Sequence, residues 1–142
     1  MCDASVTLRL TLTDPVSGVT YSLQNKDNHP VAPQTAGDGP LSFDVPLRLS
    51  EDGRWLGPFV RREGPERRFV YIAIGTSAGD HSSEWTRRAK IDIHDMPDTL
   101  KIAARSGGVP EARLPGRGKD GSPACASVRV REWRLAEGSE NG

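Results

Sequence analysis

Residues 68–76, RFVYIAIGT, decide how the chain folds. Apolar or small side chains alternate onto both faces of this stretch: Val70, Ile72 and Ile74 on one, and Phe69, Tyr71, Ala73 and Gly75 on the other. A strand that is apolar on both faces is covered on both sides by other parts of the protein. The sequence therefore predicts that residues 68–76 form the central strand of a sheet.

Segments with the two-residue period of a half-buried strand lie on either side of this stretch. They cover residues 6–12, 19–23, 41–49, 85–93, 112–114 and 126–130, the last running on towards Trp133. The link 14–18 favours a hairpin between the first two, and Pro46 places its segment at a sheet edge. This pattern predicts a mainly β fold, either an antiparallel β-sandwich or a small β-barrel, with one short helix.

Three segments lack the strand period. Residues 25–40 are polar and rich in Pro, Gly, Asn and Asp, which is typical of a long surface loop. Pro97 can occupy a first helical turn and Gly107 a C-terminal cap, so we expect the helix at residues 97–105. Residues 115–123 are expected to form an irregular loop, and the tail 137–142 to be disordered.

The composition limits the class of protein. A chain of 142 residues is the size of one domain, so we expect a single domain over residues 1–142, with an ordered core at about 5–135. The 19 basic and 19 acidic residues balance, which disfavours nucleic acid and anionic membranes as partners. Without a secretory leader or an apolar run of ~20 residues, we expect a cytoplasmic protein. Its 15 arginines and 4 lysines fit a GC-rich bacterial genome.

Two glycine-rich motifs invite a functional interpretation. Residues 75–79, GTSAG, match the Gly-x-Ser-x-Gly pattern of a nucleophile elbow, but no helical pattern follows, so a turn after the central strand is the simpler interpretation. Residues 116–121, GRGKDG, are not a Walker A loop, because Arg113 and Asp120 stand where that loop needs Gly and Ser or Thr. They are interpreted either as a generic anion-binding loop or as a solvated turn.

The segment 83–90, SEWTRRAK, gives a more specific hypothesis. The alternation that turns Ala89 inward also turns Trp85 and Arg87 inward, and an inward guanidinium needs an anionic partner. That partner is either a structural carboxylate or an anionic or planar ligand that stacks on the indole. The residues alone leave both alternatives open.

No metal or cofactor is expected. His29, His81 and His94 lack the paired spacing of zinc ligands. Cys125 has no histidine near it in the sequence, so we expect a small buried thiol rather than a nucleophile. Cys2 stands at the terminus, which disfavours a structural disulfide.

Several motifs together resemble an uncharacterised bacterial family that is known only as a domain of unknown function. They are LGPFV at 56–60, RFVYIxIGTxAG at 68–79, SxWxRRxKI at 83–91 and EARLPGxGKDGxPxCA at 111–126. The resemblance covers residues 6–133 and departs at 51–54 and in the arginine-rich last strand. It implies no reaction, and it does not require a serine at Ser77. The candidate residues that fall on its motifs are Trp85, Arg87, Arg88, Lys90, Lys119, Asp120 and Cys125.

These observations predict a domain that binds a small anionic metabolite where residues 83–90 meet the loop 119–125. The expected ligand-binding residues are Tyr71, Trp85, Arg87, Arg88, Lys90, Lys119 and Cys125. The alternative is a cofactor-independent isomerase, cyclase or hydrolase, with Lys119 and Asp120 or an uncovered tyrosine as acid–base groups. A second alternative is a protein-interaction module that uses the same face. We expect a monomer or a homodimer.

Overall fold

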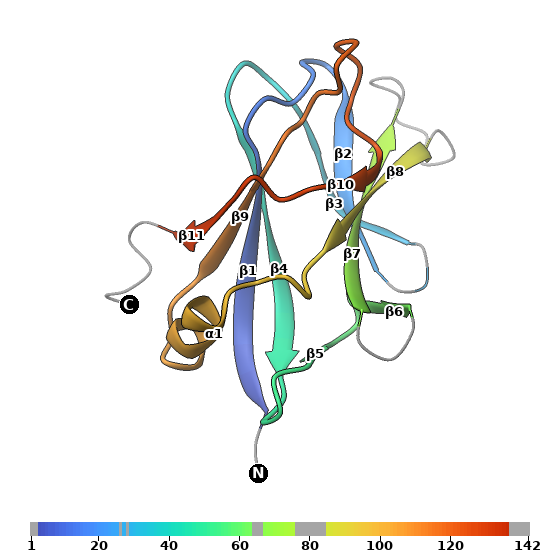
Figure 1. Ribbon diagram of the computed structural model, residues 1–142. Coiled ribbons are helices and arrows are strands. Elements are labelled where there is room, and N and C mark those ends of the chain that lie inside the picture. Colours follow the sequence, from blue (N-terminus) through green and yellow to red (C-terminus); the bar gives the residue numbers. More distant parts are fainter. Residues whose placement is uncertain (1–2, 26, 28, 64–66, 76–84, 137–142) are drawn as a thin grey trace.

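The computed structural model describes residues 3–25, 27, 29–63, 67–75 and 85–136, and most of them belong to two curled β-sheets that face each other (Figure 1). The five-stranded sheet consists, in spatial order, of β11 (Glu132–Leu135), β9 (Pro110–Leu114), β1 (Ala4–Leu12), β4 (Leu41–Leu49) and β5 (Trp55–Leu56). The six-stranded sheet consists of β10 (Ala126–Val128), β8 (Trp85–Asp92), β7 (Arg67–Gly75), β2 (Thr20–Gln24) and β3 (Pro30–Thr35), with β6 (Arg61–Glu63) beside β7. The mainly β, sandwich-like fold expected from the sequence is confirmed.

β7 is the central strand of the six-stranded sheet, as its sequence predicts. It pairs antiparallel with β2 on one side and with β8 on the other. Its inward side chains Val70 and Ile72 have no exposed surface, and the outward Tyr71 is only 7% exposed. Because β7 is covered on both faces, its sequence lacks the alternation of a half-buried strand.

The two sheets enclose one continuous apolar cluster among the described residues. β1 and β4 pair antiparallel along their whole length, and their inward side chains, including the fully buried Leu8 and Val45, supply much of this cluster. β5 pairs with β4 only at Arg48 and Leu49. The sheet-edge position predicted from Pro46 is therefore wrong, because β4 lies between β1 and β5. Pro46, which has no N–H to donate, is tolerated because the pairing with β5 does not extend to it.

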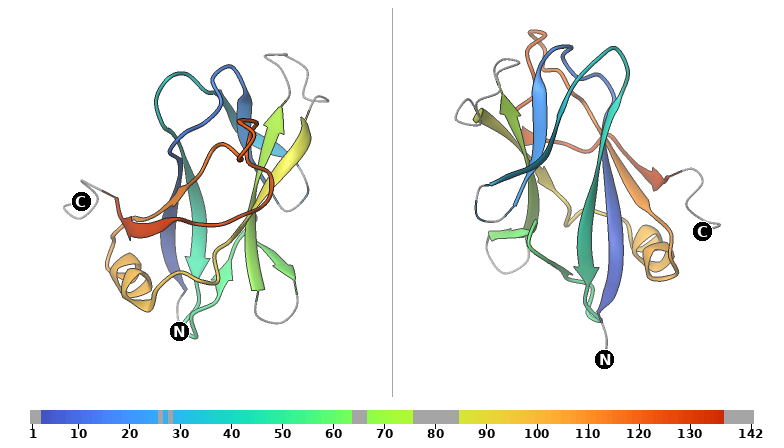
Figure 2. Two further views of the ribbon diagram at one scale, coloured as in Figure 1. Left: turned by 45° about the horizontal axis from the view of Figure 1, so that its top comes forward. Right: turned by 180° about the vertical axis from the view of Figure 1, so that it is seen from behind.

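The predicted helix is confirmed as α1 (Asp98–Arg105), which packs beside β1 and β9 (Figure 2). Pro97 precedes its first turn, and Gly107, with a φ of +101°, follows its last. Leu100 and Ala104 form its buried side. No helix in the described part of the chain is long and apolar enough to cross a membrane.

The predicted hairpin between residues 6–12 and 19–23 is wrong, because β1 and β2 belong to different sheets. The link between them turns the corner of the sandwich. Gly18 adopts a φ of +87° there, and the backbone N–H of Val16 donates a hydrogen bond to Tyr21 Oη at 3.0 Å. Alternation shows which face of a strand is buried, but it does not name the neighbouring strand.

The long surface loop predicted at residues 25–40 contains β3, an edge strand that pairs antiparallel with β2. All of its side chains from Val31 to Thr35 are exposed. No apolar alternation therefore marks the strand in the sequence. Pro30 and Pro33 are tolerated because an edge strand needs backbone donors on one side only.

The single last strand predicted at residues 126–130 is in fact two short strands in different sheets. β10 pairs parallel with β8, and β11 pairs antiparallel with β9 in the other sheet. The chain between them crosses from one sheet to the other (Figure 2). Ala126, which the alternation directed inward, is exposed and has a φ of +60°. Because β9 is also parallel to β1, both sheets are mixed rather than fully antiparallel.

Candidate functional site

The loop that joins β9 to β10 contains only turns, bends and one isolated bridge, as its sequence predicted, and backbone hydrogen bonds hold it in shape. Gly118 N donates to Ser122 O at 2.8 Å, and Ala124 N donates to Gly116 O at 3.0 Å. The carboxylate of Asp120 closes the turn, because its Oδ1 accepts hydrogen bonds from Ser122 N at 3.1 Å and from Ser122 Oγ at 2.6 Å. The structure therefore gives Asp120 a clear local role in shaping the loop.

The same loop is fixed against the corner that follows β1. Gly116 passes so close to this corner that a Cβ atom there would lie 2.6 Å from the carbonyl of Asp14 and 2.7 Å from Pro15 Cα. Arg117 Nε lies 3.2 Å from Asp14 Oδ1. Only glycine permits such an approach, so residue 116 determines where the basic residues of the loop are placed.

β10 places the end of this loop beside β8. Ala126 pairs with Ala89, and Ser127 pairs with Lys90, in a parallel register. The described part of the segment 83–90 and the end of the loop 119–125 therefore meet at one edge of the six-stranded sheet (Figure 1). The sequence predicted this meeting.

Two hollows adjoin along β10, and together we call them the β10 groove. The first has a volume of about 630 Å³ and is lined by Phe69, Lys90, Asp92, Asp95, Ser127, Val128, Arg129, Val130 and Trp133. The second has a volume of about 520 Å³, and its charged lining residues are Arg117, Lys119, Asp120, Arg129 and Arg131. The two hollows share Ser127, Val128 and Arg129. The groove thus has an aromatic end and a cationic end.

Lys119 and Asp120, the predicted acid–base pair, lie at the cationic end, and both are exposed. The pKa of Asp120 lies below its ordinary value, chiefly because Ser122 Oγ donates a hydrogen bond to the carboxylate. The charge of Arg87 acts in the same direction with a smaller effect. A carboxylate held in its charged form in this way is a weak base near neutral pH. The role of Lys119 and Asp120 as acid–base groups stays a prediction. Their exposure and the charged state of Asp120 do not favour it.

The inward position predicted for Arg87 is wrong. Arg87 pairs with Ile74 near the end of β7, where the register of the two strands shifts, and its side chain is exposed. Its partner Ile74 is only 2% exposed, so the core reaches this position on β7, but it does not cover the side chain of Arg87. The side chain of Trp85 lies outside the described part of the structure, and its stacking role stays a prediction.

Arg88 and Lys90 lie over aromatic rings of β7 on the outer face of the six-stranded sheet. The guanidinium carbon of Arg88 is 4.7 Å from the centre of the Tyr71 ring, and that of Arg61 is 5.0 Å from it. Lys90 Nζ is 4.1 Å from the centre of the Phe69 ring. Lys90 lines the β10 groove, whereas Arg88 and Tyr71 are not among the described residues that line it. Cations therefore cover the ring of Tyr71.

Cys125 lines the cationic end of the groove and is exposed, so the buried thiol expected from the sequence is wrong. Cys2, His81 and residues 76–79 of the GTSAG motif lie outside the described residues. Within the described ranges, no three His, Cys, Asp or Glu side chains gather closely enough to hold a metal ion.

Sequence reasoning missed Arg129 and Arg131 as groove residues. They follow β10 directly, where the chain crosses to the other sheet, and both line the cationic end. The available signal was the cluster of arginines in the last predicted strand. This cluster did not predict the groove, because Arg129 and Arg131 reach it only where the chain crosses from one sheet to the other.

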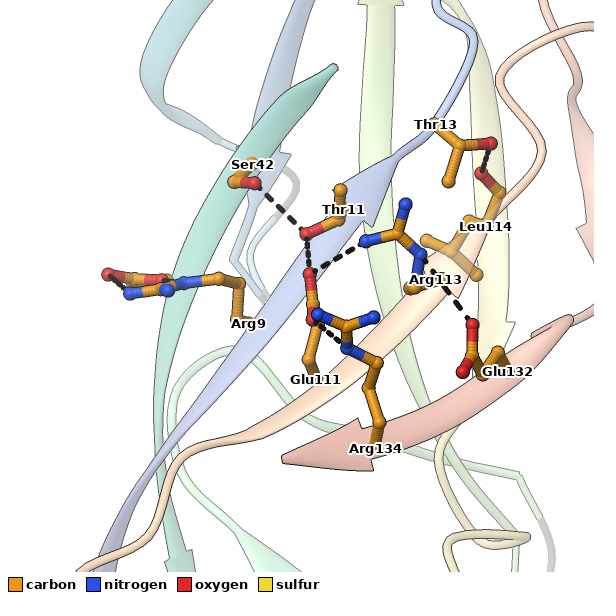
Figure 3. A network of polar contacts seen from close by, with 10 residues as sticks. Arg9, Thr11, Thr13, Ser42, Glu111, Arg113, Leu114, Glu132 and Arg134 are labelled. Carbon is orange, nitrogen blue, oxygen red and sulfur yellow. Dashed lines mark hydrogen bonds and ion pairs between the residues drawn. The ribbon is translucent and has the colours of Figure 1, made fainter. Parts of the chain in front are cut away.

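A second polar cluster lies on the outer face of the five-stranded sheet (Figure 3). At its centre Glu111 is only 6% exposed. Glu111 Oε2 accepts a hydrogen bond from Thr11 Oγ1 at 2.6 Å and lies 3.5 Å from Arg113 Nη1, and Glu111 Oε1 lies 3.0 Å from Arg134 Nε. Thr11 and Arg134 belong to the strands on either side of β9. The cluster therefore joins three strands, and we interpret it as structural.

A family of unknown function, DUF5990, matches residues 6–136 of the chain. The chain belongs to this family. The DUF5990 match runs from β1 to the residue after β11, so it contains both sheets and every described residue of the β10 groove. It confirms the family resemblance seen in the sequence motifs. No curated protein and no solved structure gave a significant match.

Proposed function

We propose that the protein binds a small organic anion in the β10 groove. The observation that carries this proposal is the set of cations at one end of the groove, Arg117, Lys119, Arg129 and Arg131. One acidic residue, Asp120, lines the same hollow, and Asp14 pairs with Arg117 from outside it. The positive charge that remains attracts an anion, and guanidinium groups bind carboxylate and phosphate oxygens through paired hydrogen bonds.

The other end of the groove favours a ligand that also has a flat or apolar part. Val130 and the partly exposed Trp133 line this end, whereas Lys90 lies over the buried ring of Phe69. The volume of about 630 Å³ is within the range of small-molecule sites. Lys90, Asp92 and Asp95 add polar groups that can orient a ligand. Ser127, Val128 and Arg129 border both hollows, and in this proposal one molecule extends along them from the aromatic part to the cationic part.

A calorimetric titration with 1-naphthyl phosphate tests the proposal, because this probe combines an aromatic ring with an anion. We expect saturable binding to the wild type and, in the double variant Arg129→Ala/Arg131→Ala, a loss of affinity of about tenfold or more from the lost charged hydrogen bonds. Arg48→Ala is the matched control, because it removes an exposed arginine that lines neither end of the groove.

Two results would contradict the proposal. The first is equal affinity for 1-naphthyl phosphate in the wild type and the double variant. The second is the absence of saturable binding with 1-naphthyl phosphate, 1-naphthyl sulfate and 1-naphthoate alike. Inorganic phosphate serves as the comparison that lacks the ring, and we expect the β10 groove to bind it more weakly.

A further inference from the structure

A separate cavity of about 250 Å³ lies beside α1. The turn between β4 and β5, the start of β7, the link before α1 and α1 itself all contribute to its lining. The residues are Asp52, Gly53, Arg54, Trp55, Arg68, His94 and Lys101. None of them lines the β10 groove.

Positive charge dominates this cavity. Arg54, Arg68 and Lys101 contribute three cations, and Asp52 contributes one carboxylate. Arg68 is only 3% exposed, so its guanidinium has lost most of its contact with water. The pKa of Arg68 lies below its ordinary value, first because of burial and then because of the charges of Arg62 and Arg54. Charges in a largely buried cavity interact more strongly than charges in water, so the cationic lining favours an anionic ligand.

Trp55 provides a second, independent observation. Its side chain is 1% exposed, and its indole Nε1 is buried with no hydrogen-bond partner among the described residues. A buried N–H group that makes no hydrogen bond costs about 1–3 kcal/mol, and native proteins rarely leave one in this state. Trp55 borders this cavity and also the hollow that Arg62 lines, and an acceptor that reaches Nε1 from the cavity would satisfy this donor.

Contacts between α1 and the turn hold the walls of the cavity in place. Lys101 Nζ donates a hydrogen bond to Gly53 O at 3.3 Å, and the guanidinium of Arg105 donates to Ser50 O. Within the turn, Arg54 Nε lies 3.3 Å from Asp52 Oδ2. The cationic groups are therefore positioned before any ligand arrives, which lowers the ordering cost of binding.

We propose that this cavity binds one phosphate group, either as inorganic phosphate or as the phosphoryl end of a small ester. The cationic side chains of Arg54 and Lys101 in its lining suit a phosphate monoester, which carries a charge of about −1.5 to −2 at neutral pH. A phosphate group also presents three acceptor oxygens, enough for a guanidinium, an ammonium and the indole N–H together. A carboxylate offers less charge and fewer acceptors. This proposal does not depend on the function proposed for the β10 groove.

The indole N–H of Trp55 gives a direct readout. In a ¹H–¹⁵N spectrum of the labelled protein, the cross-peak of Trp55 is identified by its loss in the variant Trp55→Phe. We expect sodium phosphate, added at constant ionic strength, to shift this cross-peak until it saturates, and sodium acetate to leave it in place. A parallel titration with glycerol 3-phosphate distinguishes inorganic phosphate from a phosphate ester. The compound with the lower dissociation constant is the one that the cavity accommodates better.

Matched variants locate the phosphate. Lys101→Gln should weaken phosphate binding about tenfold, the effect of one lost charged hydrogen bond. Arg9→Gln removes a cation that lies outside the cavity, on the outer face of the five-stranded sheet, and should change the affinity less than about twofold. Asp52→Asn should tighten binding severalfold, because it removes the carboxylate, and loss of structure would not produce tighter binding.

Three results would overturn the proposal. One is a Trp55 cross-peak that phosphate does not shift saturably. Another is a loss of the shift in Arg62→Gln but not in Lys101→Gln, because Arg62 lines a different hollow that Trp55 also borders. The third is a loss of the shift in Arg129→Ala/Arg131→Ala, which would show that phosphate acts from the β10 groove.

Discussion

Glu111 occupies an outward position on β9, where the alternation of the strand predicts solvent, and it is nevertheless buried. The long side chains of Arg113 and Arg134 lie over it, and Thr11 donates a short hydrogen bond to it from β1 (Figure 3). A carboxylate in such surroundings is stabilising only while its partners stay in place. Its removal would leave two guanidinium groups and a buried hydroxyl without this acceptor.

We expect Glu111→Ala to lower the free energy of unfolding by about 2–3 kcal/mol, because it breaks a largely buried ionic cluster. The control is Asp44→Ala, which removes the more exposed Arg9–Asp44 pair on the same face and should cost less than about 1 kcal/mol. Urea unfolding of both variants measures the difference. A similar loss of unfolding free energy in the two variants would show that the burial of Glu111 does not increase the stability of the fold.

For single residues, the sequence was a good guide to which segments lie side by side. It was a poorer guide to the direction in which a side chain points. Lys90, Lys119 and Cys125 all line the β10 groove, as expected for residues of two neighbouring segments. Arg87 failed the prediction because strand parity identifies a face of the sheet but does not show whether other parts of the chain cover each side chain on that face. Glu111 was not predicted at all, because its burial depends on side chains from other strands.

Among the elements, the loop between β9 and β10 depends most on one close contact. Gly116 allows the loop to lie against the carbonyl of Asp14, and this contact places the cations at the end of the β10 groove. The stability of the fold and the shape of the groove are therefore linked at residue 116.

Gly116→Ala should lower the free energy of unfolding by about 1–3 kcal/mol, because its Cβ would overlap backbone atoms that cannot easily move. It should also weaken the binding of 1-naphthyl phosphate. Gly39→Ala is the control, since a Cβ at Gly39 meets nothing within 4 Å. Thermal unfolding and the calorimetric titration measure the two effects, and a Gly116→Ala protein that matches this control in both would refute the link.

The corner between β1 and β2 gives a prediction that depends on pH. Burial raises the pKa of Tyr21 above its ordinary value, although the hydrogen bond from Val16 N acts in the opposite direction. The buried neutral phenol therefore contributes stability below the pKa of the unfolded chain, about 10, and this contribution is lost as the pH rises through the higher folded pKa.

Tyr21→Phe should cost about 1 kcal/mol at pH 7, because the Val16 N–H loses its acceptor. Between pH 9 and about 11 the wild type should lose this advantage over the variant, because only the wild type has a phenol that ionises more easily when unfolded. Urea unfolding of both proteins across this range is the measurement. A difference that stays constant with pH would show that Tyr21 does not titrate with folding.

The elements themselves were predictable wherever one face is buried. The alternating apolar residues of β1 and β4 fix those strands, and the doubly apolar stretch fixes β7. β3 was missed because its side chains are exposed on both faces. The hairpin and the single last strand were wrong because the partner of a strand is chosen by packing between sheets, which periodicity does not encode.

At the scale of the whole molecule, the described residues form one apolar cluster that supports both sheets. β7 lies at its centre, and Ile72 is completely buried there, whereas Val31 on the edge strand β3 is exposed. The two sheets should therefore unfold together.

Ile72→Ala should lower the free energy of unfolding by about 2–5 kcal/mol, and Val31→Ala should change it by less than about 0.5 kcal/mol. Far-ultraviolet circular dichroism and tryptophan fluorescence should give the same midpoint for each protein, because loss of the shared cluster removes both sheets at once. Separate midpoints would show that one sheet persists without the other.

The parallel pairing of β1 with β9 has a consequence for how the chain is made. β1 can pair with β4 soon after both are synthesised, but its other edge stays open until β9 has left the ribosome. During that interval the growing chain presents an unpaired row of N–H and C=O groups on an apolar sheet, which invites pairing with neighbouring nascent chains. Slow translation between β4 and β9 would lengthen this exposure, so soluble yield should depend on the speed at which that part of the message is read.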